Sequence, residues 1–217
     1  MNQRELTVIR LQCPACGRAM PSLDTDVVWG CQSCECAYEL EEETLVRRKL
    51  IRIAPPATSD TGLLLYLPFW RVMLAARAAG GEHTAAATVA ELMSERPAWV
   101  RAFAMRGAFH CGDPGQLLSE HGWQEERAAG PVPPCLGARL PSAEAVKLAR
   151  WLLLNRADRK RDVSGIEIDI ALGELHLALL PLALDKESER VQLLHAFGSY
   201  RRETLLDLPA ILRGHEA

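Results

Sequence analysis

Residues 30–40 of the chain read GCQSCECAYEL and contain three cysteines within six positions. Residues 11–17 read LQCPACG and contain two more, so that two Cys-x2-Cys pairs are separated by 14 residues. This separation is one residue short of the usual spacing of a four-cysteine zinc site. Two tight turns that each present two sulfur atoms provide the four thiolates that tetrahedral zinc requires. The sequence therefore predicts one Zn2+ ion bound by the four cysteines of these pairs: Cys13, Cys16, Cys31 and Cys34.

The two pairs resemble those of the zinc-ribbon family, which includes transcription-associated proteins, RNA polymerase subunits and ribosomal proteins, and the resemblance covers about residues 6–53. It implies a small all-β module in which the four cysteines are the metal ligands. Gly17 follows the first pair, where the turn requires a residue that tolerates a positive φ. Glu35 occupies the equivalent position after the second pair and departs from the family pattern. Tyr38 matches the aromatic residue that packs on the ribbon in that family.

Cys36 is the spare thiol of this region, and we interpret it as a small buried hydrophobic residue rather than as a ligand in place of Cys34. An iron–sulfur cluster also uses four thiolates, but such sites usually have tighter runs of cysteines. A thioredoxin-like redox role requires a single pair on a βαβ background, which this sequence lacks. A structural zinc ion is therefore the favoured interpretation.

The composition and the charge of the sequence restrict the class of protein and its cellular compartment. Of its 217 residues, 48% are hydrophobic, which is sufficient for a packed core. The formal net charge of -3 provides no broad positive field to attract nucleic acid or anionic lipid. The most apolar run, residues 63–79, contains Arg71 and Arg77 and falls short of the roughly 20 apolar residues of a membrane-spanning helix. Seven cysteines and a start without an apolar signal segment indicate a cytoplasmic protein that is not inserted into a membrane.

The chain divides into two parts. Pro, Ser, Thr, Asp and Gly cluster in residues 54–62, which predicts a linker there. Residues 1–53 contain short runs of β-branched residues between the cysteine pairs and are predicted to form the zinc ribbon. Residues 63–217 are predicted to form an α+β domain with a mainly antiparallel sheet. The fold class that we expect for the whole chain is therefore α+β.

Three helices are predicted in the second part, at residues 84–97, 112–122 and 141–161. Asp113 and Ser142 are the predicted N-caps of the second and third of these helices, because short polar side chains accept hydrogen bonds from the first turn.

The predicted strands of the second part lie on either side of these helices. Residues 63–75 form an apolar run in which Pro68 indicates an edge position or a bulge. Residues 165–184 alternate between apolar and polar side chains and predict a hairpin that turns at Gly173. Residues 190–197 predict a third strand.

We assign no catalytic residues. The six histidines show no metal or triad spacing, and neither a glycine-rich phosphate loop nor a nucleophile elbow occurs. Cys111 follows His110, but adjacent residues of an extended segment point apart and cannot form a dyad. Four polar residues of the predicted hairpin share one face, either as an acid/base or metal cluster or, more commonly, as the solvent side of a sheet. These residues are Glu167, Asp169, Glu174 and His176.

The lack of catalytic signatures favours a non-catalytic accessory or adaptor protein that binds a protein partner. A nucleic-acid-binding factor is the alternative, with the ribbon and the basic runs at residues 47–52 and 156–161 as its contacts. Residues 1–53 carry seven Lys or Arg against eight Asp or Glu, which argues against this alternative. An enzyme with an unrecognised site is the third possibility. The anchors that we predict for a protein partner are aromatic residues near turns and prolines: Phe69, Trp70, Trp99 and Trp123.

Overall fold

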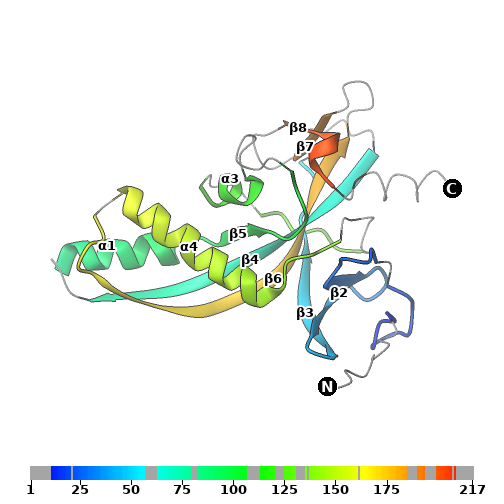
Figure 1. Ribbon diagram of the computed structural model, residues 1–217, viewed down its shortest axis with the longest axis horizontal. Coiled ribbons are helices and arrows are strands. Elements are labelled where there is room, and N and C mark those ends of the chain that lie inside the picture. Colours follow the sequence, from blue (N-terminus) through cyan, green and yellow to red (C-terminus); the bar gives the residue numbers. More distant parts are fainter. Residues whose placement is uncertain are drawn as a thin grey trace, which may run out of the picture.

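The computed structural model has an α+β fold with a mainly antiparallel sheet, as predicted (Figure 1). It describes residues 11–20, 22–56, 63–79, 83–106, 113–120, 125–130, 135, 137–160, 162–184, 190–193, 199–206 and 208. In chain order, its elements are β1 (Val28–Cys31), β2 (Cys36–Glu41), β3 (Thr44–Arg52), β4 (Leu63–Ala79), α1 (His83–Ser94), β5 (Ala98–Arg101), α3 (Pro114–Glu120), α4 (Ser142–Lys160), β6 (Glu167–Leu184), β7 (Arg190–Leu193), β8 (Ser199–Arg201) and the 3-10 turn η1 (Arg202–Thr204). The strands follow the order β1-β2-β3-β6-β4-β5, and β7 pairs with both β6 and β8.

The first part of the described chain, residues 11–53, is an all-β module that we call the ribbon. Strands β1, β2 and β3 form an antiparallel meander, and a turn in which Glu42 has a φ of 55° joins β2 to β3. The ribbon has a small core of its own, formed by the buried side chains of Cys13, Met20, Trp29, Cys31, Cys36 and Tyr38.

Strand β3 connects the ribbon to the rest of the molecule. Its first residues pair with β2, whereas Leu50, Ile51 and Arg52 pair in parallel with β6. The boundary that we predicted after residue 53 therefore follows a strand that pairs both with β2 of the ribbon and with β6. The predicted linker, residues 54–62, lies in part outside the described residues.

Two long strands, β4 and β6, form the centre of the fold. They pair antiparallel from Leu63 opposite Leu184 to Ala79 opposite Glu167. The predicted hairpin at Gly173 is wrong, because β6 continues through this residue. A Cβ atom at Gly173 would lie 3.2 Å from the carbonyl oxygen of Met73, and the register shifts nearby on β4. The glycine thus permits close approach of two strands at a bulge.

Pro68 lies inside β4, which is flanked by β6 and β5, so the predicted edge position is wrong; the register shift of β4, the other predicted possibility, lies between Val72 and Leu74 and not at the proline. The proline lies where β5 ends. Its carbonyl oxygen accepts a hydrogen bond from the N–H of Ala102 at 3.1 Å, and the carbonyl of Ala102 accepts the N–H of Arg139 at 2.7 Å. Proline has no N–H, so Pro68 cannot donate to the carbonyl of Ala102 as another residue would in an antiparallel pair. The N–H of Arg139 donates to this carbonyl instead.

Helices cover one face of the β4–β6 pair. The helices α1 and α4 lie along the end of this pair that is remote from the ribbon (Figure 1). Alternate residues of β4, namely Trp70, Val72 and Leu74, belong to the same buried cluster as the helical side chains Val89, Met93, Ala145, Ala149 and Leu153. The short helix α3 and strands β7 and β8 cover the opposite face at the other end, around Leu65, Leu67 and Phe69.

The two predicted N-caps differ. Asp113 caps α3, since its Oδ1 accepts the N–H of Gly115 at 2.8 Å. Ser142 is not the N-cap of α4, because it is itself the first residue of the helix; its hydroxyl accepts a hydrogen bond from Arg48 at 3.2 Å. The N–H of Ser142 instead donates to Oε1 of Glu39 at 2.6 Å, so a buried carboxylate from β2 caps the helix.

Candidate metal centre

The four cysteines of the two pairs lie together in the ribbon. The sulfur atoms of Cys13, Cys16, Cys31 and Cys34 all lie within 4.8 Å of one another. Those of Cys16 and Cys31 are 3.7 Å apart. A tetrahedron of thiolates around a metal with bonds of about 2.3 Å has sulfur-to-sulfur edges of about 3.8 Å. The arrangement is therefore compatible with one metal ion held by four thiolates.

Each pair is part of a tight turn. In the first turn, the N–H of Gly17 donates to the carbonyl of Cys13 at 2.8 Å, and the φ of Gly17 is 71°. In the second turn, Glu35 has a φ of 49°. Glu35 thus adopts the left-handed conformation that the family pattern assigns to glycine, although a side chain makes this conformation strained. Its carboxylate accepts the N–H of Gly130 at 2.7 Å.

The local electrostatics favour a thiolate at Cys13. Burial raises the pKa of this thiol, but hydrogen bonds from the backbone N–H groups of Ala15 and Cys16 and from neighbouring thiols outweigh it and lower the pKa to about 6. The pKa of Cys34 is raised by its hydrogen bond with Cys16, by burial and by the neighbouring thiols. Because a metal ion binds the thiolate form of cysteine, metal binding at this cluster would release protons.

Cys36 lies outside this cluster, as its interpretation as a hydrophobic residue requires. Cys36 lies opposite Cys31 in the antiparallel register of β1 and β2 and is 2% exposed. Burial raises the pKa of its thiol. Tyr38, the predicted ribbon aromatic, is also buried, and its hydroxyl oxygen lies 3.9 Å from the sulfur of Cys13.

The polar face of β6 does not form a comparable cluster. Within the described part of the chain, the four cysteines are the one group of three or more potential ligands that converge. Glu167, Asp169 and Glu174 are exposed, whereas His176 is buried. Cys111 and His110 lie outside the described residues.

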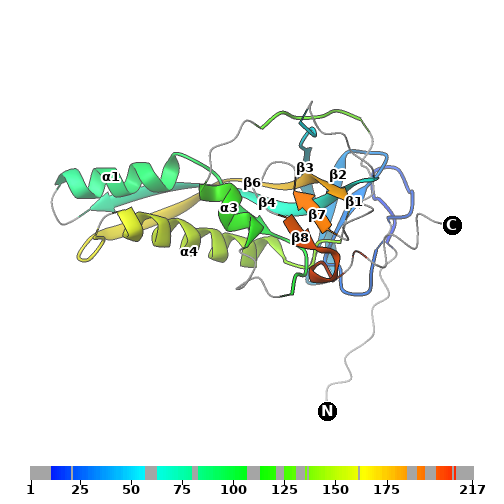
Figure 2. The same ribbon diagram turned by 90° about the horizontal axis from the view of Figure 1, so that it is seen from above.

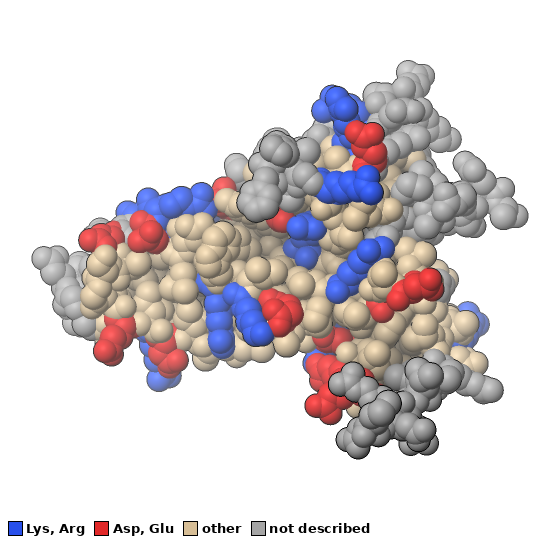
Figure 3. All heavy atoms as spheres, in the orientation of Figure 1, with Lys and Arg blue, Asp and Glu red and all other residues tan. Residues whose placement is uncertain are grey.

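Three arginines of the two basic runs form ion pairs. Arg48 pairs with Glu39 at 2.7 Å and with Glu41. In the second run, Arg156 is buried and lies 3.5 Å from a carboxylate oxygen of Glu95, and Arg159 pairs with Glu120 at 2.8 Å. On the face seen in Figure 3, Lys and Arg side chains are scattered among Asp and Glu. These pairs weaken the nucleic-acid alternative.

The predicted aromatic anchors are wrong where the structure describes them. Phe69 and Trp70 are 0% exposed and Trp99 is 2% exposed, because Phe69 and Trp70 of β4 and Trp99 of β5 all face the buried clusters. Trp123 lies outside the described residues. Among the described residues, the exposed aromatic side chain is instead Trp151 of α4, at 59%, one turn after Leu148 at 44%. A helical projection places Leu148 beside the buried stripe of Ala145, Ala149 and Leu153 and Trp151 on the opposite side of the helix, and this was the available signal.

No protein-family model, no curated protein and no solved structure matches this chain. No helix in the described part of the chain is both long enough and apolar enough to cross a membrane. The cysteine cluster and the exposed surfaces of the molecule are therefore the features that bear on its function.

Proposed function

We propose that the chain is a non-catalytic accessory or adaptor protein, in which a structural zinc ion stabilises the ribbon and an exposed apolar surface of α4 binds a protein partner. We define this α4 surface as Leu148 and Trp151. The observation that carries the proposal is the 59% exposure of Trp151.

The chemistry of the donor set supports zinc. Thiolates are soft ligands, and a tetrahedral set of four is typical of zinc or of iron–sulfur centres. The two pairs come from two turns rather than from one dense run of cysteines, which favours zinc. Four protein ligands leave no position for water or substrate, so a zinc ion here would act in folding and not in catalysis.

The α4 surface has the composition of a binding anchor. Residues three apart on a helix face the same side, which places Leu148 next to Trp151. Tryptophan is enriched among the interface residues that contribute most to binding energy. Truncation of Trp151 leaves no cavity in the core, because the side chain already contacts solvent. A loss of binding on its removal is therefore separable from a loss of folding.

The test is affinity capture from native lysate followed by a binding measurement with the captured protein. We expect Trp151→Ala to weaken binding about 30-fold, the effect of losing an anchor worth about 2 kcal/mol. Asp158→Ala is the matched control, because Asp158 is an exposed residue of the same helix. Equal binding by the wild type and by Trp151→Ala would contradict the proposal, as would equal loss in the control.

A further inference from the structure

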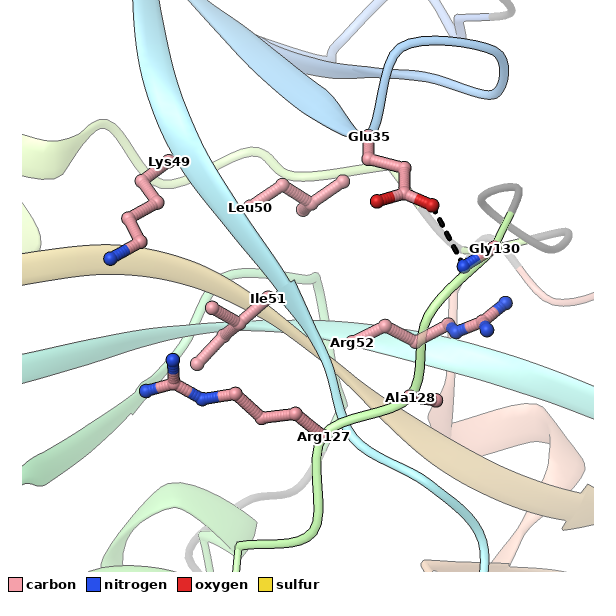
Figure 4. A pocket seen from close by; sticks show the side chains of 8 residues that line it. All are labelled: Glu35, Lys49, Leu50, Ile51, Arg52, Arg127, Ala128 and Gly130. Carbon is pink, nitrogen blue, oxygen red and sulfur yellow. Dashed lines mark hydrogen bonds between the residues drawn. The ribbon is translucent and has the colours of Figure 1, made fainter.

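A second surface of interest is a pocket at the edge of β3 (Figure 4). Residues 125–130, which form one of its walls, lie on the opposite side of the sheet from α4 (Figure 2). The turn between β1 and β2, the end of β3 and residues 125–130 form the walls of the pocket. Its volume is about 210 Å³. It is lined by Glu35, Lys49, Leu50, Ile51, Arg52, Arg127, Ala128 and Gly130.

Hydrogen bonds to the ribbon and to β3 fix the outer wall. The N–H of Ala128 donates to the carbonyl of Arg52 at 2.9 Å, and the N–H of Gly130 donates to Glu35 at 2.7 Å. The guanidinium group of Arg52 donates to the carbonyl of Ala129. The wall is therefore a built part of the fold, and Glu35 and Arg52 are both engaged in holding it.

Two other cations of the pocket are not engaged in this way. Lys49 and Arg127 extend to the same side of β3, past Ile51 (Figure 4). Among the described residues, neither side chain has a hydrogen bond or an ion pair. Two uncompensated cations that face the same space create a positive potential suited to an anion.

His176 lies directly behind Lys49. The parallel pairing of Leu50 with Leu177 places Lys49 of β3 beside His176 of β6, on the same face of the sheet. Arg71 of β4 is the neighbour of His176 on its other side. The imidazole is 94% buried, and its Nδ1 has no hydrogen-bond partner among the described residues.

The charges around His176 are mainly positive. Burial lowers its pKa, and the charges of Lys49, Arg71 and Arg127 lower it further, whereas Glu174 alone raises it. Arg71 is already paired, with Nε 2.9 Å from a carboxylate oxygen of Glu125 and with Glu174 at 3.5 Å. Lys49 and Arg127 thus remain as the cations that an incoming anion would meet.

We infer that Lys49 and Arg127, backed by His176, form a binding site for the phosphate group of a small molecule. Arginine and lysine both bind phosphate, the first through a planar fork of donors and the second as a point charge. The volume of about 210 Å³ lies below the range of roughly 300 to 1,000 Å³ of pockets for drug-sized ligands. A single phosphate with a short organic group fits this size.

The experiment is a titration of the full-length protein with inorganic phosphate at constant ionic strength, followed through the imidazole resonances in NMR spectra. His176→Gln identifies the resonance of His176 by its loss. We expect saturable binding that raises the pKa of His176, because a nearby negative charge stabilises the imidazolium form. Lys49→Gln and Arg127→Gln should each weaken binding about 10-fold, the loss of one charge-assisted hydrogen bond.

Two controls make the result specific. Lys147→Gln removes an exposed lysine of α4, on the other side of the sheet, and should leave phosphate binding unchanged. Lys49→Arg keeps the charge and should retain binding. A linear, unsaturable response to phosphate would overturn the inference, and so would equal weakening by Lys147→Gln. Tighter binding of an oligonucleotide than of phosphate, with the same dependence on Lys49, would show that the ligand is a nucleic acid, and this would also overturn the inference of a small ligand.

Discussion

The four cysteines of the cluster differ from their neighbour Cys36 in where their sulfur atoms lie. Their sulfurs converge within 4.8 Å, whereas Cys36 points into the ribbon core on the strand that leaves the second turn. Cys34 and Cys36 are the same type of residue and lie only two positions apart. The backbone geometry therefore decides which of the two sulfur atoms joins the cluster.

We therefore predict that Cys31→Ser loses bound zinc, while Cys36→Ser keeps about one equivalent per chain. Removing one of four thiolates breaks the tetrahedral shell, but removing the spare thiol changes only packing. Metal analysis of the two purified variants by mass spectrometry provides the measurement. Zinc loss from Cys36→Ser together with retention in Cys31→Ser would reverse the assignment.

The turn glycine gives a second test at the same scale. A Cβ atom at Gly17 would meet nothing within 4 Å, so the cost of Gly17→Ala arises from its φ of 71° alone. We expect this variant to lower the free energy of unfolding of the metal-loaded protein by about 1 kcal/mol. Denaturant titration measures this change. Gly165, which has a φ of 74° and equally open surroundings far from the metal, is the control for a general glycine effect.

At the scale of elements, the ribbon is attached to α4 through a carboxylate. Glu39 of β2 is 1% exposed, accepts the N–H of Ser142 at 2.6 Å and pairs with Arg48 at 2.7 Å. Glu41, on the same strand, also pairs with Arg48 but is exposed. The two acids share a partner and differ in burial, which makes them a matched pair.

We predict that Glu39→Ala lowers the free energy of unfolding by about 2 kcal/mol, because it leaves a buried N–H without an acceptor and removes the cap of α4. Glu41→Ala should cost less than about 1 kcal/mol, as is usual for exposed ion pairs. Thermal unfolding followed by circular dichroism compares the two. Equal destabilisation by both variants would show that the charge of Arg48, and not the cap, is the relevant contact.

Local signals predicted the elements better than their pairing. The capping residue Asp113 and the apolar stripe of α4 place two helices correctly, since both are properties of a few adjacent residues. Gly173 misled the prediction, because a glycine at a turn and a glycine at a close approach of two strands look identical in sequence. The buried state of Trp70 likewise depends on α1 and α4 packing over it, which no local pattern reveals.

The candidate sites show the same difference between local sequence signals and long-range contacts. The cysteine cluster was predictable because two Cys-x2-Cys pairs at this separation are a sequence signature of a four-cysteine metal site. The pocket of Lys49 and Arg127 was not, because these residues are 78 positions apart and meet only when residues 125–130 pair with the end of β3. Similarly, the cap of α4 comes from a strand about 100 residues earlier in the chain, at Glu39.

At the scale of the whole molecule, the ribbon and the remainder have distinct cores but share a strand. The cluster around Cys13 and Tyr38 is separate from the two clusters on the faces of the β4–β6 pair. Only Val28 and Ala37 of β1 and β2 extend into the cluster beneath α4. Metal binding worth about 10 to 16 kcal/mol in small zinc modules would therefore act mainly on the ribbon.

We predict that a chelator exposes the amides of residues 11–43 to hydrogen exchange while β4, β6 and α4 stay protected. The reason is that the ribbon core is too small to persist without metal, whereas the long strand pair and its helices bury apolar side chains of their own. Residues Leu50, Ile51 and Arg52 should keep intermediate protection, since they pair with β6 rather than with the ribbon. Hydrogen exchange read by mass spectrometry, with and without chelator, resolves these segments. Simultaneous loss of protection in the ribbon and in β4 would show that the chain unfolds as one cooperative unit, with β3 transmitting the loss of metal to the central strands.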